Sequence, residues 1–492
     1  MKQNEVGWLV RSGMLAATVA IYFPCCFAQS GQRQPATAFA PGTSRSPDWG
    51  QWMDATASTA LIHGRSIVQV AISPDGKLLA WIESSRGGTE IEVAPLSDLN
   101  KSLHVTASSN GPAVCEEYGL AWAPHGDAVA FFSDCAQPHK QADLYLSHLN
   151  GDASQRLTRL KGRAGDPAFS PDGDQIAFLL VEGSEGRASE PGGTQPGNGA
   201  MQRIALVRAK QAKGDSEAPI RLVSPDDLQV YEFDWAPDGL SMAYVASEVL
   251  APAHPCGSRL LVEQLAGADR VSWPPADQGR APRALVNLDG SEPSPGPCRI
   301  AGPRWSPDGR QIAFLGTSGE SRETSAWTVD AEGGRPRNLS QGRPTSAGWV
   351  EWEGQDHLFV NEIAGGNTQL LRYRLPKEMP DSNSAVSFGA PIFSIPGTVD
   401  DGRMCFSLSA TQDHSLFVFR STSMQGPQEI YGAKPGVVMS AGLEGVLHLS
   451  HSDATLEPAE NGPILTLWSS EKYRAQEWRC RPMVRVRRRI AQ

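Results

Sequence analysis

The sequence predicts an all-β fold, a single β-propeller of about seven four-stranded blades. Three observations predict it: one short pattern recurs five times, each copy has the residues of a β-hairpin, and two further strand-like segments follow most copies. The 492 residues also include 49 Gly and 37 Pro, a composition that favours many turns over long helices. A repeating unit of four antiparallel strands is the blade of a β-propeller.

The recurring pattern is centred on a proline, which we take as position zero. Glycine follows at +2, alanine at +6 and an aromatic residue at +7, and a large apolar residue precedes at −2. Such internal similarity at a regular spacing indicates a repeat architecture. The proline and glycine of the five copies are Pro74 and Gly76, Pro124 and Gly126, Pro171 and Gly173, Pro237 and Gly239, and Pro307 and Gly309.

Each copy has the chemistry of a tight hairpin. Proline presets the backbone angle of the first central turn position, and glycine takes the left-handed conformation. The residues that follow alternate between apolar and polar, as in a half-buried strand. A third strand is expected downstream, for example at 143–146 and 325–329, and a short fourth strand at 155–158 and 337–340.

The spacing of the copies sets the blade count. Successive prolines are 50, 47, 66 and 70 residues apart, so the first two intervals fit bare blades and the longer two predict insertions near 182–200 and 248–283. Two decayed copies, 348–360 and 406–419, keep the second strand without the turn and bring the count to seven. An eighth blade would need 464–469 as a further strand. We expect the ring to close by pairing between its first and last blades.

The N-terminus predicts export. Lys2 and Arg11 precede an apolar run at 14–28 that ends in small residues, the pattern of a secretory signal peptide. The run is shorter than the ~20 residues that span a bilayer as a helix, and an uncleaved anchor is the alternative. We expect a signal peptide at 1–28, a linker at 29–59 and a periplasmic or secreted protein that has no membrane contact after cleavage.

Two of the cysteines face each other in the second hairpin. If its strands pair in the simple register around the turn, so that Ala123 pairs with Asp127, then Cys115 lies opposite Cys135. Residues in this relation are close enough for a disulfide. The alternative is a pair of buried free thiols.

A second pair, Cys256 and Cys298, flanks the insertion of the fourth blade and would staple it. An exported protein permits such disulfides because its compartment is oxidising. The chain contains no CxxC pair, so the sequence indicates neither a zinc ribbon nor a thioredoxin-type redox motif.

No catalytic motif is present. The chain lacks the GxSxG of an α/β-hydrolase, HExxH, a P-loop and an EF-hand loop, so the sequence predicts no catalytic residue, metal ligand or cofactor. The formal net charge is −10, which argues against nucleic acid as a partner. Glu116 and Glu117 lie at the start of an inner strand, where they would hold a peptide amino terminus if they faced the central channel. A solvated carboxylate pair is the alternative.

The repeats resemble those of two known groups of propellers. The SPDG-x-x-IAF units are similar to those of TolB-type periplasmic proteins and of the N-terminal propeller of prolyl oligopeptidase family serine peptidases. The second resemblance is closer: residues 300–316 and 346–360 resemble the dipeptidyl and acylaminoacyl peptidase branch. The segments 447–451, 463–470 and 474–478 are similar to the passage from propeller to catalytic domain in that family.

The resemblance implies a propeller that covers a peptidase active site and admits short peptides. In the family the hydrolase domain follows, whereas here the sequence after Trp478 reads RCRPMVRVRRRIAQ. No catalytic Ser, Asp or His of the family has a position to be carried onto. We interpret 60–455 as the propeller and 456–492 as a remnant of the junction with a basic tail, left by a frameshift or truncation, or as the authentic end of a short protein. Without a hydrolase, the face that it covers should be unusually apolar.

Three functions follow from the resemblance. The first is a non-catalytic exported propeller that binds peptides or another protein. The second is part of a prolyl oligopeptidase family peptidase whose hydrolase domain is supplied by a separate chain or lost by frameshift. The third is a TolB-like periplasmic scaffold.

Overall fold

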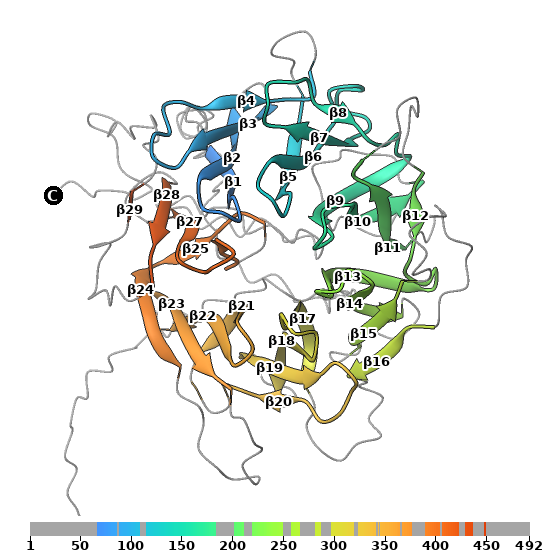
Figure 1. Ribbon diagram of the computed structural model, residues 1–492. Helices are drawn as coiled ribbons and strands as arrows, with labels where there is room; N and C mark the ends of the chain where they lie inside the picture. The colour runs from blue at the N-terminus through green and yellow to red at the C-terminus, as the bar shows by residue number, and fades with distance from the viewer. Residues whose placement is uncertain are drawn as a thin grey trace, which may run out of the picture.

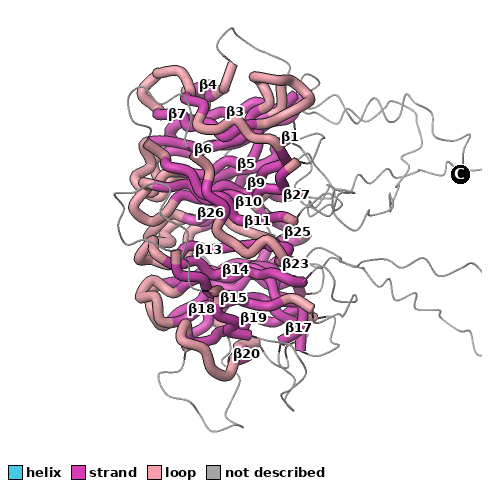
Figure 2. Tube along the Cα trace, turned by 90° about the vertical axis from the view of Figure 1, so that its right-hand side faces the viewer, coloured by secondary structure: helices cyan, strands magenta, loops and turns pink. Residues whose placement is uncertain are grey.

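A computed structural model shows an all-β protein, in which seven antiparallel sheets surround a central axis (Figure 1). Seen from the side, the strands cross the thickness of the ring (Figure 2). The predicted seven-bladed propeller is confirmed. No helix in the described part of the chain is long and apolar enough to cross a membrane. The structure describes residues 66–85, 88–108, 115–183, 201–210, 219–248, 257–265, 281–286, 297–318, 323–340, 343, 345–364, 367–375, 389–403, 406–422, 429–435 and 447–448.

Each blade is built from strands that follow one another in the sequence, and the first strand of each lies nearest the axis (Figure 1). Blades one and two contain β1 (Ser66–Ile72), β2 (Leu78–Ser85), β3 (Gly88–Pro95) and β4 (Leu103–Val105), then β5 (Glu117–Trp122), β6 (Ala128–Ser133), β7 (Asp143–His148) and β8 (Gln155–Arg156). Blades three and four contain β9 (Gly162–Phe169), β10 (Gln175–Glu182), β11 (Gln202–Arg208) and β12 (Arg221–Leu222), then β13 (Leu228–Trp235), β14 (Ser241–Glu248), β15 (Arg259–Gln264) and β16 (Arg283–Val286).

The remaining blades follow the same order, with one extra strand at the end. Blades five and six contain β17 (Pro297–Trp305), β18 (Gln311–Ser318), β19 (Thr324–Asp330) and β20 (Arg337–Asn338), then β21 (Ser346–Glu353), β22 (His357–Ala364), β23 (Asn367–Arg374) and β24 (Ala390–Pro396). In blade seven, two short inner strands pair with the same partner: β25 (Thr398–Asp400) and β26 (Ser409–Ala410) both pair with β27 (Phe417–Thr422), and β28 (Glu429–Ala433) and β29 (Leu447–His448) follow.

The recurring proline and glycine form the turn between the first two strands of a blade. In blade one, the Gly76 amide donates to the Ser73 carbonyl at 2.9 Å, and Gly76 has a φ of 72°. A left-handed conformation costs other residues about 1–2 kcal/mol, which explains the glycine at +2. Asp75 accepts from the Ser73 hydroxyl at 2.8 Å and from the Lys77 amide at 3.1 Å, which closes the turn.

The turns of successive blades also touch one another around the ring. A Cβ atom on Gly173 would meet Pro124 Cδ of the preceding turn at 3.4 Å. The contact is tighter where the last blade meets the first, because a Cβ on Gly76 would lie 3.0 Å from Thr411 Cγ2. The neighbouring turn therefore favours glycine in addition to the backbone angle at Gly76, whereas at Gly173 the contact would be an ordinary one.

Blade seven keeps this turn, although its sequence was expected to lack it. Thr411, Asp413 and His414 take the places of Ser, Asp and Gly: the His414 amide donates to the Thr411 carbonyl at 2.9 Å and the Thr411 hydroxyl to Asp413 at 2.7 Å. His414 has a φ of 53°, and its ring centroid lies 5.5 Å from Phe359 and 6.1 Å from Phe417. Packing against these rings offsets the strain that glycine avoids in the other copies.

The inner strand of blade two contains a β-bulge that the sequence spacing does not reveal. Next to the turn, Trp122 pairs with Val129, which is one residue away from the partner that the simple register predicts. A bulge that includes Gly119 corrects this offset, so that farther from the turn Glu117 pairs with Ser133, as the simple register predicts. Similar shifts interrupt the first hairpins of blades one, three, four, five and six. A bulge bends the strand, increases its twist and redirects its side chains.

The large residue at −2 joins each blade to the one before it. Trp305, at this position in blade five, has a buried indole Nε1 with no hydrogen-bond partner. The hydrophobic core clusters extend across the blade boundaries. In one of them, Leu315 of blade five packs with Trp352 and Val360 of blade six. Three tryptophans donate their indole N–H to the carbonyl at −3 of the preceding blade: Trp122 to Ala71 (3.0 Å), Trp235 to Ala168 (3.2 Å) and Trp352 to Arg304 (2.9 Å).

In the part of the chain that the structure describes, the first and last blades contact each other but share no strand, so the expected closure by a common sheet is not seen there. Among the described residues, blade one uses only β1–β4 and blade seven only β25–β29. The two blades are joined by main-chain hydrogen bonds, from the Val70 amide to the Asp401 carbonyl at 2.8 Å and from the Gln412 amide to the Pro74 carbonyl at 2.9 Å, and by side-chain contacts. Arg420 pairs with Asp400 at 2.5 Å and donates to the Ile67 carbonyl of β1 at 2.7 Å. The bond from Arg420 to Ile67 crosses the seam, whereas the ion pair with Asp400 lies within blade seven and holds the Arg420 side chain in place.

The insertion predicted near 248–283 is too long. It contains β15 and ends where β16 begins, so the third strand of blade four lies inside it. The sequence pattern did not predict this six-residue strand because Gly, Pro and Ala residues surround it. Other predicted segments lie outside the described residues: the signal peptide 1–28, the linker 29–59, most of the insertion 182–200, the strand 464–469 and the junction 456–492.

Candidate functional site

Charged side chains gather at one position of the repeat. Position −3, next to the large residue at −2, falls on the innermost strand of each blade (Figure 1). It is alanine in blades one to three and charged in the next three, where it is Asp234, Arg304 and Glu351. Three adjacent inner strands therefore carry an acid, a base and an acid in turn.

These side chains interact across the blade boundaries. Arg304 Nε lies 3.6 Å from Glu351 Oε2, and Asp234 Oδ2 accepts from the Trp305 amide at 2.8 Å. The Arg304 side chain is 17% exposed and that of Glu351 is 34% exposed. The ring of blades therefore encloses these groups while solvent still reaches them.

Three more charged residues extend this group. Glu232, two residues before Asp234 on β13, accepts from the Gly302 amide of blade five. The charge of Asp166 on β9 acts on Glu232, and the exposed Arg403, after β25, acts on the carboxylates of blades four and six. We call the whole set the channel cluster: Asp166, Glu232, Asp234, Arg304, Glu351 and Arg403.

The channel cluster contains four carboxylates and two guanidinium groups, an excess of two negative charges when all are ionised. Burial raises the pKa of Asp234 to about 6, although the charge of Arg304 opposes the shift. Burial also raises the pKa of Glu232 and of Glu351. Enclosed carboxylates with too few cations are stabilised by a further cation nearby. The cluster is therefore suited to a cationic group such as an amino terminus or a Lys or Arg side chain.

Glu117, for which the sequence left open a place in the channel or in solvent together with Glu116, is buried between blades one and two. It is 1% exposed and accepts from the Thr106 hydroxyl at 2.9 Å and the Ala107 amide at 2.8 Å, both from blade one. Burial raises the pKa of Glu117 to about 7 in spite of these donors. Neither alternative holds for Glu117, because the direction of a side chain on this strand depends on the bulge at Gly119.

The predicted cysteine pair of blade two is close to this carboxyl group. Cys115 and Cys135 are joined by a disulfide with Cα atoms 5.0 Å apart, in the outer part of the hairpin where the simple register holds. Cys298 also takes part in a disulfide, and Cys256, its predicted partner, lies outside the described residues.

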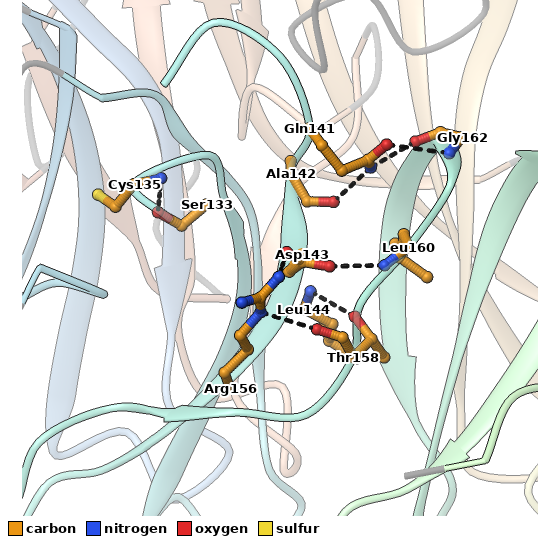
Figure 3. Close-up of polar contacts among 10 residues, drawn as sticks. All are labelled: Ser133, Cys135, Gln141, Ala142, Asp143, Leu144, Arg156, Thr158, Leu160 and Gly162. Carbon is orange, nitrogen blue, oxygen red and sulfur yellow. Dashed lines mark hydrogen bonds and ion pairs between the residues drawn. The ribbon is translucent and has the colours of Figure 1, made fainter. Parts of the chain in front are cut away.

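A set of buried and half-buried polar groups lies where blade two meets blade three (Figure 3). The Gln141 side chain donates to the Gly162 carbonyl at 2.7 Å and accepts from the Gly162 amide at 3.0 Å. Asp143 pairs with Arg156 and accepts from the Leu160 amide at 2.7 Å. Since these groups are paired with one another, we assign the set to holding the blades together.

The surface of the described part has no apolar patch of large side chains. Only Leu103 and Ile220 among those residues are large apolar side chains with more than a third of their surface exposed, at 45% and 37%. The unusually apolar face expected from the peptidase resemblance is not found in that part of the chain.

The channel cluster was missed although the sequence contains a signal for it. The positions that repeat define the blade, whereas a site lies where the repeat changes. The change from alanine to charged residues is visible as soon as the five copies are aligned from position −3: Ala71, Ala121, Ala168, Asp234 and Arg304.

Comparison with known sequences gives short matches. No protein family model matches the chain. A TolB homologue of Chlorobium luteolum is 27% identical over 127 residues, which are 26% of this chain and 27% of that protein. The uncharacterized peptidase YuxL of Bacillus subtilis is 27% identical over 124 residues, 24% of this chain and 16% of that protein. The aligned part is thus a minor share of both relatives.

Comparison with solved structures extends over most of the chain. A puromycin-hydrolyzing peptidase of Mycobacterium tuberculosis has a TM-score of 0.53 and is 13% identical, covering 84% of this chain and 57% of that one. The β-propeller domain of the Trilobed protease from Pyrococcus furiosus has a TM-score of 0.50 and is 10% identical, covering 80% and 100%. The chain resembles the propellers of peptidases. At these identities the likeness shows the fold alone, and at that level the predicted resemblance is confirmed.

Proposed function

We propose that the chain is a non-catalytic, exported β-propeller that binds peptides, or an extended segment of another protein, through a cationic group in its central channel. The channel cluster carries this proposal. Its six charged residues come from blades three to seven, they have an excess of carboxylates, and the ring half encloses them. An ammonium group entering the cluster would donate charge-assisted hydrogen bonds to Asp234 and Glu351.

The fold and the sequence matches support a role in binding. Peptidase propellers have this fold, and a TolB homologue matches part of the sequence. We propose that the partner is a free peptide or another protein, a separate hydrolase domain included, and that residues 1–28 direct export. We expect no labelling of the chain by a probe for active serines.

The experiment compares two short fluorescent peptides that differ only in a free or an acetylated amino terminus. We expect the free peptide to bind at least about tenfold more tightly at low salt, because acetylation removes its charge, and added salt should narrow the difference. Glu351→Gln should weaken binding of the free peptide about three- to tenfold. Glu332→Gln is the matched control, since its side chain is 97% exposed and lies outside the cluster. Equal affinity for both peptides, or equal effects of both variants, would refute the proposal.

A further inference from the structure

The disulfide of blade two lies against a buried carboxyl group. Cys135 Sγ is 3.6 Å from Glu117 Oε1. The two sulfur atoms and a carboxylate oxygen of Glu117 all lie within 4.8 Å of one another. Hydrogen bonds from Thr106 and Ala107 hold Oε1 in this place. Because Oε1 accepts these bonds, the proton of the neutral carboxyl group is on Oε2, and a small movement of the carboxyl group or of a sulfur atom would allow that proton to be transferred.

The two cysteine residues differ in exposure to solvent. Cys115 is 4% exposed and packs against blade one, where its carbonyl lies only 2.2 Å from the place of a Cβ atom on Gly88. Cys135 is half-buried and follows Ser133 at the end of β6, where its amide donates to the Ser133 hydroxyl (Figure 3). A thiolate that approaches from solvent therefore reaches Cys135 first.

From this geometry we propose that the Cys115–Cys135 disulfide is a redox site that exchanges with an external dithiol, with Glu117 as its proton donor. The dithiol's thiolate attacks Cys135 Sγ, a mixed disulfide forms there, and the bond to Cys115 breaks with its electron pair on Cys115 Sγ. Glu117 gives its proton to this sulfur and becomes a carboxylate. The second thiolate of the dithiol then releases Cys135 as a thiolate, which takes a proton from solvent. The protein gains two electrons, and the dithiol leaves as a cyclic disulfide.

The electrostatic surroundings suit this role. With a pKa raised to about 7 by burial, Glu117 keeps a proton to give near neutral pH. His104 of β4 favours its ionised form, while Tyr145 of β7 feels the charge of the carboxylate. The paired Asp143 and Arg156 also act on Tyr145, and Asp134 accepts from the amide of Glu116, the residue before Glu117, at 2.7 Å.

The test follows reduction of the folded full-length chain by dithiothreitol between pH 5.5 and 9, with a metal chelator present. Alkylation and mass spectrometry report on Cys115 and Cys135 separately. We expect the rate constant per thiolate to fall about tenfold per pH unit above the pKa of Glu117, and the trapped mixed disulfide to contain Cys135. In Glu117→Gln the rate should be lower and independent of pH. Glu116→Gln, the neighbouring carboxylate, should behave as wild type.

Three results would overturn the proposal: one pH profile shared by Glu117→Gln and wild type, a mixed disulfide at Cys115, or reduction only at the rate of global unfolding. If Glu117→Gln does not fold, a second variant, Thr106→Val, tests the role of Glu117 as proton donor. Thr106→Val removes a donor that favours the ionised carboxylate, so it should raise the pKa of Glu117 and move the inflection to higher pH. An unmoved inflection in a folded Thr106→Val protein would equally count against it.

Discussion

The indole Nε1 of Trp352 in blade six lies 2.9 Å from the main-chain carbonyl oxygen of Arg304 in blade five. Arg304 is the cation at the centre of the channel cluster, so this hydrogen bond fixes the strand that carries it. Position −2, which packs one blade on the next, and position −3, which carries the charged side chains, are thus neighbours on each inner strand. The hydrogen bond from Trp352 to Arg304 also links position −2 of blade six to position −3 of blade five.

This bond should contribute measurably to stability. Trp352→Phe removes the donor and leaves the Arg304 carbonyl short of a partner, so we expect the free energy of unfolding in urea to fall by about 1–2 kcal/mol more than in the control. The control is Trp305→Phe, the same change at the same repeat position, where Nε1 has no hydrogen-bond partner. Equal losses in the two variants would show that only ring volume matters.

Asp234 should destabilise the fold as the pH rises. Its pKa is 3.8 as a free group and about 6 in the folded protein, so the folded state binds the proton more tightly. The stability that the protonated form contributes is fully present below pH 3.8 and is lost as the pH rises through 6. Two pH units correspond to about 3 kcal/mol, which partial exposure to solvent reduces to about 1–2 kcal/mol.

Asp234→Asn mimics the protonated form, so it should raise Tm at pH 8 and leave Tm at pH 4 nearly unchanged. Thermal unfolding at both pH values measures the difference. A lower Tm at pH 8 would mean that the carboxylate gains more from Arg304 and Arg403 than it loses by burial. Such a variant would also separate stability from the proposed peptide binding, which it should weaken.

The contact between neighbouring turns can be measured with two glycines. Gly76→Ala and Gly354→Ala both place a Cβ at a positive φ, 72° and 63°, but only the first meets a neighbour, Thr411 Cγ2 at 3.0 Å. We expect each to lose about 1–2 kcal/mol from strain and Gly76→Ala to lose about 1 kcal/mol more. Chemical denaturation of the two variants measures these free energies of unfolding. Similar losses of stability would mean that Thr411 moves away from the new methyl group at little cost.

Removing the disulfide of blade two should destabilise the protein. The cross-link closes a loop with a sequence separation of 20 residues, which corresponds to about 3 kcal/mol in the chain-entropy model. The double variant Cys115→Ser and Cys135→Ser should therefore unfold at a lower urea concentration than wild type. A loss well under 1 kcal/mol would show that the contacts of Glu117 with blade one hold this hairpin without the cross-link.

The sequence predicts the blades because their chemistry is local. Proline, glycine and the apolar positions act within a dozen residues of each other, so five copies reveal the hairpin. The turn at Thr411 was hidden because His414, held by aromatic neighbours from another part of the chain, replaces glycine. The direction of Glu117 depends on a bulge, and the closure through Arg420 joins residues more than 350 positions apart. Such features depend on neighbours that the spacing of a repeat does not specify.

Among the described residues no strand is exchanged at the seam between blades seven and one, and this has a consequence for how the ring can be rebuilt. In the part of the chain that the structure describes, each blade is one uninterrupted stretch of sequence, so none of these sheets combines strands from the two ends of that part. A circular permutant opened between blades three and four, with a linker across the present seam, would keep all seven sheets whole. By the same reasoning, duplication or deletion of the sequence of one blade would leave the strand order of the other blades unchanged. Blades four to six, which carry charged residues at position −3, are consecutive in the sequence and could be exchanged as one segment.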